Sequence, residues 1–460
     1  MAEDFAVAII GGGLSGVLVA AQLLAQATMP LTIAVIERDA TLGQGVAYST
    51  SQPTHLLNVR AENMSALPDQ PAHFAEWLHT NALQPTAETA FVPRMHYAAY
   101  LRSLLAECAA NARSGVTYTH LHASATDIIR MAGGLRITLD DGRTISAGHV
   151  VLALGNLPPA DPLARVAGDC TRARVRSGYE ASAAALASIG ADDEIVLIGT
   201  GLTAVDVLLA LQAQGHRGKL HAVSRHGLLP LAHQPRAPYP PYLAAHIPVT
   251  SARLLTHLVH REARRATAQG QDWRGVVDAL RPITQQLWLD LPDAERQRFL
   301  RHVRTYWDIH RHRIAPEIAA VVHTLLASGQ LRVSAGRIVA YHEDTAGAAL
   351  TLRPRHSHTT HVLRADHVFN CTGPTGDYGA TSDPFVTRLR GSGLLCADTL
   401  HQGIAADTAG RVLDATGEPS ATISTLGPPL KGVVWECIAV PDIRIQARDL
   451  AARVLAGMTA

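Results

Sequence analysis

The sequence predicts an α/β fold in which two parallel-sheet units follow one plan and a helical segment is inserted in the second unit. The first observation is a glycine turn, residues 11–16, between an apolar run over 6–10 and a helical stretch reaching about Gln26. The second is the return of the same order of strand, glycine turn and helix around residues 199–204. The third is the loss of this order over 229–330.

The first glycine turn, Gly11-Gly12-Gly13-Leu14-Ser15-Gly16, has the G-x-G-x-x-G spacing of a dinucleotide-binding turn. Its first glycine permits the tight turn, its second lets the backbone approach a pyrophosphate, and its third lets the helix pack on the strand. The free N–H groups at the start of the helix favour phosphate binding. The predicted cofactor contacts here are Gly11, Gly13, Leu14, Ser15 and Gly16.

An acid closes the second strand of this unit. Glu37 follows the apolar run 31–36 and lies 21 residues beyond Gly16, and both Glu37 and the adjacent Arg38 are predicted cofactor contacts. That spacing is usual for a carboxylate that accepts the ribose hydroxyls of an adenine dinucleotide. We therefore predict a bound dinucleotide; the alternative is a glycine-rich turn in an unrelated α/β fold.

Several later segments are candidates for the same kind of contact. Residues 43–48 are either a surface turn or a loop around the far half of the dinucleotide, and the mixed apolar and amide stretch 55–60 favours the loop. Each unit also closes with a buried strand that runs into glycine and proline, at 150–159 and at 368–374. The candidate contacts are Gly45, Tyr48, Asn58, Gly155, Gly373 and Gly427.

The second glycine turn, Gly199-Thr200-Gly201-Leu202-Thr203-Ala204, has alanine in the third position, as this fingerprint permits. Its second strand, 219–223, ends in Ser224-Arg225-His226 where the first unit has an acid. A carboxylate would repel a ribose 2′-phosphate, whereas a hydroxyl and a guanidinium can bind it. We predict NADPH here, against the alternative of a surface arginine, with contacts from Gly199, Gly201, Leu202, Thr203, Ser224 and Arg225.

Two such sites in one chain fit hydride transfer from NADPH to a flavin held by the first unit. The predicted domains are an FAD-binding domain (1–160 and 374–460), an NADPH-binding domain (161–228 and 331–373) and an inserted helical substrate or lid subdomain (229–330). Within the insert, helical stretches are expected at 251–268, 273–289, 293–306 and 314–328, after a proline-rich connector.

Composition narrows the class of partner. Of 460 residues, 47% are hydrophobic and 17% charged, and 40 Lys and Arg nearly cancel 39 Asp and Glu, so neither nucleic acid nor a membrane is expected. No secretion signal or metal-ligand spacing is recognised, and we expect a cytoplasmic enzyme without a metal, with a homodimer left open. Five scattered cysteines without C-x-x-C disfavour a disulfide-reducing flavoenzyme and a zinc site.

These motifs make the chain resemble the YdhS-like group of FAD/NAD(P)-binding proteins, which is related to flavin-dependent and N-hydroxylating monooxygenases. The segments that carry the resemblance are 11–16, 43–48, 55–61, 199–206, 224–230, 307–316 and 426–444. The resemblance implies that FAD, NADPH and O2 hydroxylate a small polar or anionic metabolite through a C4a-(hydro)peroxyflavin. Amino-acid N-oxidation and hydroxylation of a urate-like heterocycle are both open. By analogy Asn58 supplies an amide near the isoalloxazine, with a purely structural asparagine as the alternative.

The substrate is expected to contact residues 306–313, which hold two aromatic and four potentially cationic side chains. On a helix Trp307 and Arg311 would share one face, and His310 and Arg313 another. We expect Trp307 over the flavin and Arg311 or Arg313 on an anionic substrate or on an NADPH phosphate; a solvated basic helix is the alternative. Lys431 and Trp435 are further candidates, and the predicted catalytic residues are Asn58, Arg311 and Lys431.

Two other functions stay open at this point. One is an NADPH-dependent flavin reductase or dehydrogenase without oxygen transfer. The other is a non-catalytic redox sensor that binds a flavin.

Overall fold

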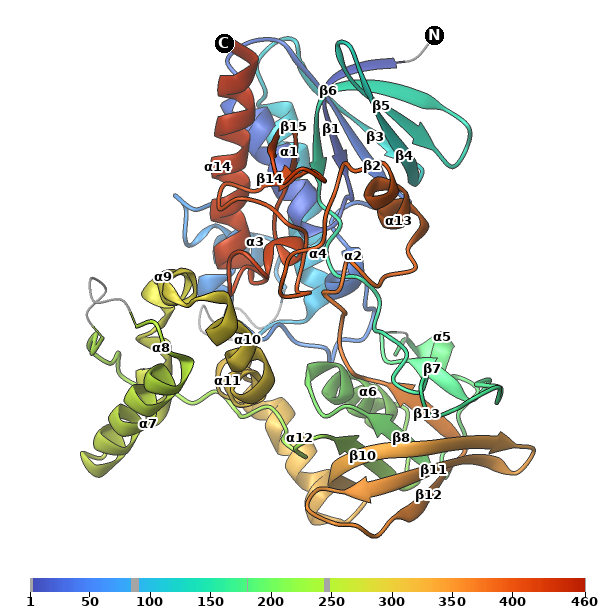
Figure 1. Ribbon diagram of the computed structural model, residues 1–460. Coiled ribbons are helices and arrows are strands. Elements are labelled where there is room, and N and C mark those ends of the chain that lie inside the picture. The colour runs from blue at the N-terminus through green and yellow to red at the C-terminus, as the bar shows by residue number, and fades with distance from the viewer. Residues whose placement is uncertain (1–2, 84–90, 180, 244–248, 460) are drawn as a thin grey trace. The chain divides into compact units, whose positions relative to one another are not determined.

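The computed structural model describes residues 3–83, 91–179, 181–243 and 249–459, and its contacts divide the chain into two units (Figure 1). Unit 1 consists of Met1–Ser49, Val59–Leu157 and Thr375–Ala460, and unit 2 of Thr50–Asn58 and Pro158–Pro374. The helical segment expected as a separate subdomain therefore falls within unit 2.

Unit 1 contains both glycine-rich segments of the N-terminal region. Its elements are β1 (Glu3–Ile10), α1 (Leu14–Gln26), β2 (Leu31–Glu37), α2 (Gly45–Tyr48), η1 (Ala61–Asn63), α3 (His73–Thr80), α4 (Arg94–Ala110), β3 (Val116–His122), β4 (Ala125–Met131), β5 (Gly134–Leu139), β6 (Thr144–Leu152), α13 (Pro384–Gly391), β14 (Arg411–Leu413), β15 (Pro419–Thr425), η3 (Pro428–Leu430) and α14 (Val440–Thr459).

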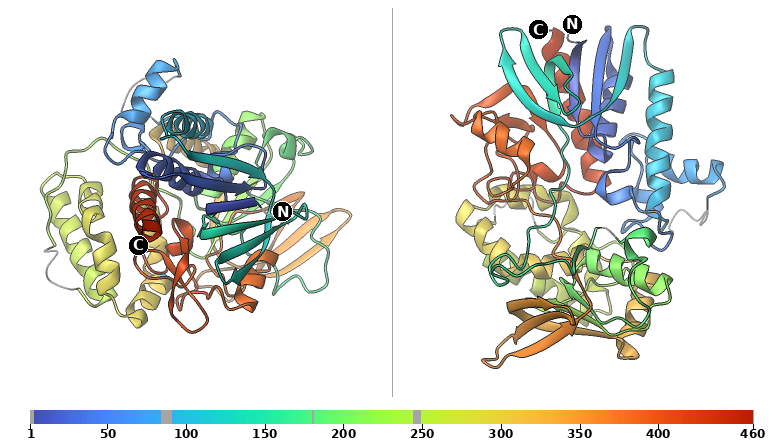
Figure 2. Two further views of the ribbon diagram at one scale, coloured as in Figure 1. Left: turned by 90° about the horizontal axis from the view of Figure 1, so that it is seen from above. Right: turned by 90° about the vertical axis from the view of Figure 1, so that its right-hand side faces the viewer.

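The sheet of unit 1 confirms the predicted order of strand, glycine turn, helix and strand. Its main path is β14-β15-β6-β1-β2-β3, with β1 parallel to both β2 and β6, and β4 and β5 extend it from β6. Residues 7–10 of β1 are at most 5% exposed, as an unbroken apolar run on a doubly covered strand should be. Helix α1 contacts both α4 and α14, and the three run alongside the sheet (Figures 1 and 2).

Unit 2 contains the second glycine turn and the helical insert. Its elements are β7 (Val175–Ser177), α5 (Ala183–Leu186), β8 (Ile195–Ile198), α6 (Leu202–Ala213), β9 (Leu220–Ser224), α7 (Ala252–Ala268), α8 (Trp273–Asp278), η2 (Arg281–Ile283), α9 (Thr284–Asp290), α10 (Asp293–His302), α11 (Arg304–Arg311), α12 (Pro316–Ala327), β10 (Leu331–Asp344), β11 (Gly347–Pro354), β12 (His361–Ala365) and β13 (His367–Asn370).

The sheet of unit 2 repeats the plan of the first and adds an antiparallel ribbon. Its strand order is β12-β11-β10-β9-β8-β13-β7; β7, β13, β8, β9 and β10 are parallel, and β11 and β12 return antiparallel (Figure 1). Helix α12, which was assigned to the insert by its sequence, contacts α6 and β10. That helix therefore covers the nucleotide-binding sheet.

Two of the four helical stretches expected in the insert are broken, whereas the stretch 251–268 is confirmed as α7. The stretch 273–289 is interrupted by the 3-10 turn η2 at Pro282, where proline lacks the N–H that a continuous helix needs. The stretch 293–306 breaks at Val303, and α11 then runs to Arg311. The expectation that His310 and Arg313 share a helical face is wrong, because Arg313 lies beyond the end of α11.

Candidate dinucleotide sites

The first glycine turn is shaped by two very close backbone approaches. Gly11 has φ +105°, and a Cβ atom there would lie 2.4 Å from the carbonyl oxygen of Ala153. A Cβ at Gly16 would lie 1.8 Å from the carbonyl oxygen of Gly11, so α1 begins in direct contact with the turn. Only glycine fits at these two positions, as the motif predicts.

Other predicted contacts gather around this turn. The N–H of Gly43 donates to the carbonyl of Gly12 at 2.8 Å, and the ideal Cβ position of Gly13 is 3.4 Å from the Cα of Gly45. Gly427, with φ +71°, would place a Cβ 2.7 Å from the Oγ of Ser15 near the start of α1. The fold therefore brings segments 43–45 and 427 to the turn in unit 1, and Leu14 is the first residue of α1.

Glu37 has a structural task that the sequence did not reveal. Its Oε2 accepts a 2.6 Å hydrogen bond from the N–H of Gly12, and its Oε1 accepts one from the N–H of Asp39 at 3.1 Å. Each oxygen keeps a second lone pair, so the carboxylate can still accept from a ribose hydroxyl. The adjacent Arg38 is exposed.

Glu37→Ala should therefore lower both stability and flavin retention. Removing the acceptor of the Gly12 N–H is expected to cost about 1–3 kcal/mol. The measurements are the flavin content of the purified protein and its free energy of unfolding. Glu37→Gln, which keeps one acceptor oxygen, should retain more of both; unchanged flavin content in the alanine variant would contradict a ribose role.

Three more residues of unit 1 were predicted to contact the cofactor or the substrate, and two of them are buried. Tyr48 is 8% exposed and packs against Tyr97 with ring centroids 4.9 Å apart, and burial raises the pKa of Tyr48 well above its usual range. Trp435, expected to face a substrate, is only 3% exposed, and the ammonium of Lys431 lies 5.1 Å from its ring centroid. Tyr48 and Trp435 are thus packing residues, which argues against substrate contact by Trp435. Gly155 has φ +65° and open space at its Cβ position.

The second glycine turn has the same close approach and one open position. Gly199 has φ +120°, and a Cβ there would lie 2.2 Å from the carbonyl oxygen of Cys371. At Gly201, the N-cap of α6, an added Cβ would meet no described atom within 4 Å. This open face of the backbone suits the close approach of a pyrophosphate. Leu202 and Thr203 form the first turn of α6, and Gly373 has φ +80°.

The end of β9 carries the polar groups predicted for a 2′-phosphate. The Ser224 Oγ accepts from the N–H of Gly227 at 3.0 Å and lies 2.9 Å from the Thr200 Oγ1. The Thr200 Oγ1 also lies 2.5 Å from the carbonyl of Leu228. Ser224 and Thr200 therefore stabilise the turn that follows β9 and join it to the glycine turn. Arg225 beside it is exposed, and no ion pair to a described residue is found for it.

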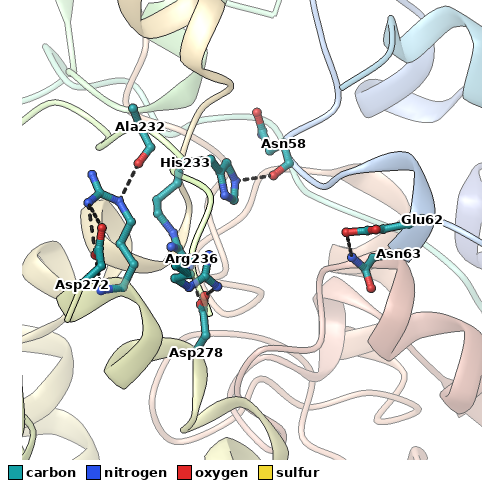
Figure 3. A network of polar contacts seen from close by, with 10 residues as sticks. Asn58, Glu62, Asn63, Ala232, His233, Arg236, Asp272 and Asp278 are labelled. Carbon is teal, nitrogen blue, oxygen red and sulfur yellow. Dashed lines mark hydrogen bonds and ion pairs between the residues drawn. The ribbon is translucent and has the colours of Figure 1, made fainter. Parts of the chain in front are cut away.

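Asn58 lies in the Thr50–Asn58 segment, which belongs to unit 2. The buried His55 ring bonds to Thr50 Oγ1 at 2.8 Å and to the carbonyl of Asp206 in α6 at 3.0 Å, which fixes the segment on that helix. The ring of His233 bonds through Nε2 to the backbone carbonyl of Asn58 at 3.0 Å (Figure 3). The backbone of Asn58 is thus held in place; no hydrogen bond from its half-buried side-chain amide to another described residue is found.

Residues 307–313 form less of a basic surface than the sequence suggested. Arg313 is 2% exposed and pairs with Asp278, which also pairs with Arg236 (Figure 3). This placement gives Arg313 a structural role and argues against substrate binding. Trp307 packs against Phe299 in the core of the insert, with ring centroids 6.3 Å apart.

The other predicted residues of this segment lie nearer its surface. His310 packs against Trp273, with ring centroids 4.7 Å apart, and its Nδ1 lies 2.7 Å from the carbonyl of Tyr306. Arg311, at the end of α11, is half-buried. No helix in the described ranges is long and apolar enough to cross a membrane, and no group of three His, Cys, Asp or Glu side chains suited to a metal is found there.

Comparisons with known proteins agree with this architecture. Residues 8–157 match a family model described as FAD-NAD(P)-binding. A search of curated proteins finds no match. Among solved structures the chain is similar to the ornithine N-hydroxylase of Kutzneria sp. 744 in its KtzI-FADred-NADP+-L-orn form, with TM-score 0.64, 15% identity and coverage of 98% of this chain and 99% of that one.

Two further structures show the range of activities found on this fold. L-lysine 6-monooxygenase from Pseudomonas syringae aligns with TM-score 0.66 and 16% identity, covering 98% of this chain and 99% of that one. The bacillithiol disulfide reductase YpdA of Staphylococcus aureus aligns with TM-score 0.57 and 13% identity, covering 99% of each chain. Residues 8–157 therefore match the FAD-NAD(P)-binding family, and the chain has the fold of flavoproteins with two dinucleotide domains.

Proposed function

We propose that the chain is an FAD- and NADPH-dependent monooxygenase that hydroxylates a small polar or anionic metabolite, with N-hydroxylation of an amino acid as the preferred reaction. The observation that carries the proposal is the second strand, glycine turn and helix, which ends in Ser224-Arg225 where the first copy ends in Glu37. Similarity over nearly the whole length to ornithine and lysine hydroxylases supports this reaction class.

Two separate sets of residues would bind the two nucleotides. The turn at Gly11–Gly16 and Glu37 would hold FAD, and the open backbone at Gly201 with Arg225 would hold NADPH. Bound FAD would supply the redox chemistry, namely hydride acceptance from NADPH and activation of O2. In the overall reaction, substrate, O2, NADPH and a proton give hydroxylated product, NADP+ and water. Within unit 2 His233 fixes the backbone of Asn58, and a role of its side-chain amide toward the flavin stays a prediction by analogy.

The test follows NADPH oxidation by the FAD-loaded protein together with hydrogen peroxide release. The candidate substrates are L-ornithine, L-lysine, cadaverine and urate. We expect NADPH to bleach the flavin without oxygen, and one of the amines to raise NADPH oxidation while lowering peroxide release per turnover. Under 18O2 the product should carry one labelled oxygen. Flavin that NADPH does not bleach would contradict the proposal.

A flavin reductase without oxygen transfer is the second candidate, because a disulfide reductase shares the fold. The cysteines argue against a dithiol mechanism. All five are free, and Cys371 and Cys437 are buried. Burial raises the pKa of the Cys437 thiol to about 12, which suppresses the thiolate that disulfide exchange requires. Turnover with an acceptor but without labelled product under 18O2 would favour this candidate over the monooxygenase.

A further inference from the structure

The turn that follows β9 meets the end of the antiparallel ribbon in unit 2. Gly227, with φ +62°, would place a Cβ 3.0 Å from the backbone nitrogen of Ala335 in β10. The N–H of Arg355, just after β11, donates to the carbonyl of the same Ala335 at 2.8 Å. These backbone contacts bring a residue 129 positions downstream to the side of His226.

At this junction one guanidinium contacts the imidazole of His226 and a second acts on it through its charge. The Arg355 Nη1 donates to the Nδ1 of His226 at 2.6 Å, so this histidine is neutral and carries its proton on Nε2. Burial, and then the charges of Arg355 and Arg225, lower the pKa of His226. The other side of the imidazole packs edge-on against Tyr306 of α11, with ring centroids 5.6 Å apart.

No described carboxylate balances the charge at this junction. Arg225 and Arg355 are both exposed, and no ion pair links either of them to a carboxylate in the described ranges. Holding like charges close together costs free energy unless an anion lies between or beside them. Guanidinium groups bind phosphate oxygens through paired, charge-assisted hydrogen bonds.

We propose that Arg355 is a second 2′-phosphate residue, which His226 positions beside Arg225 so that the three side chains select NADPH over NADH. This inference rests on the proposed function and deepens it by naming residues that determine cofactor specificity. Arg355 supplies charge, and the Nδ1 of His226 orients its guanidinium. Tyr306 limits the rotation of the imidazole.

The test measures binding of adenosine 2′,5′-bisphosphate and of 5′-AMP to the full-length FAD-loaded protein by calorimetry. The first probe carries the 2′-phosphate and the second lacks it. Arg355→Ala should weaken binding of the bisphosphate by about tenfold or more, as loss of charge-assisted hydrogen bonds implies, and leave 5′-AMP binding unchanged. Arg225→Ala should behave the same way. In turnover the KM for NADPH should rise while kcat and the KM for NADH stay the same.

Matched variants separate this role from a general effect of surface charge. Arg364→Ala removes an equally exposed arginine from β12 and should change neither probe. His226→Asn keeps an acceptor in place of Nδ1 and should bind the bisphosphate better than His226→Ala. Equal losses in the two His226 variants would overturn the positioning role.

The outcomes also separate this inference from the proposed function. Wild-type protein that prefers the bisphosphate, together with an Arg355→Ala variant that binds it equally well, would sink the Arg355 assignment and leave the monooxygenase proposal intact. If the wild-type protein binds both probes equally, it does not recognise the 2′-phosphate, and the assignment of NADPH as the hydride donor loses its support.

Discussion

Gly201→Ala is expected to abolish tight NADP+ binding and NADPH-driven flavin reduction while leaving the fold intact. The added Cβ meets no described atom within 4 Å, and Gly201 has an extended backbone that any residue can adopt. The stability cost should be no more than about 1 kcal/mol, because alanine is a poorer N-cap for α6 than glycine. The methyl group would instead occupy the space where a pyrophosphate approaches the turn.

The measurements are NADP+ affinity by calorimetry and the free energy of unfolding of the same protein. Gly199→Ala is the matched variant, because φ +120° and a Cβ 2.2 Å from the carbonyl oxygen of Cys371 should destabilise unit 2 as well. Flavin content should be unaffected in Gly201→Ala, since the flavin is assigned to unit 1. NADP+ affinity equal to wild type in Gly201→Ala would place the nucleotide elsewhere.

Local motifs were the part of the molecule that the sequence predicted best. The two strand, glycine turn and helix units lie where the pattern placed them, because each depends on contacts within about thirty residues. Close backbone approaches require glycine at positions 11, 16 and 199, as the spacing of the motif already implied. The close approach of Gly45 to Gly13 was not predicted, because the sequence indicated a surface turn or a loop around the far half of the dinucleotide.

Contacts between distant segments could not be predicted in this way. Thr50–Asn58 interrupts unit 1 in sequence but belongs to unit 2, and His55 bonds to a carbonyl of α6 more than a hundred residues later. Arg355 lies beside His226 only because the ribbon of β10 and β11 folds back. Arg355 is exposed in a loop and belongs to no recognisable motif. The sequence feature that could have identified Arg355 is a cationic residue directly after a strand that pairs with β10.

Charge runs were the least reliable guide to the site. Arg313 sits in a run that is typical of a solvated helix, yet α11 ends two residues earlier and the side chain is buried against Asp278, 35 positions before it. Trp435 lay beside a predicted substrate lysine, but the turn after η3 puts its ring in the interior. In both cases the side chain's direction depends on where a helix or turn ends, which sequence patterns locate only within a few residues.

Asp278→Ala should destabilise unit 2 more than any surface substitution. Asp278 pairs with both Arg313 and Arg236, and Arg313 is 2% exposed, so removing the carboxylate leaves a buried guanidinium without this counter-charge. Breaking a buried ion pair typically costs 3–5 kcal/mol, and we expect about 3 kcal/mol because the Asp278 side chain is itself 24% exposed. Chemical denaturation monitored by tryptophan fluorescence and by circular dichroism would measure this loss.

The control uses an ion pair of the same chemistry at the surface. Asp192 and Arg217 are joined at 2.9 Å, but their side chains are 73% and 69% exposed, so Asp192→Ala should have little effect on stability. Adding Arg313→Met to Asp278→Ala should recover part of the loss, because it removes the buried charge itself. If the double variant is no more stable than Asp278→Ala, the cost arises from packing around α8 and not from the loss of this counter-charge to Arg313.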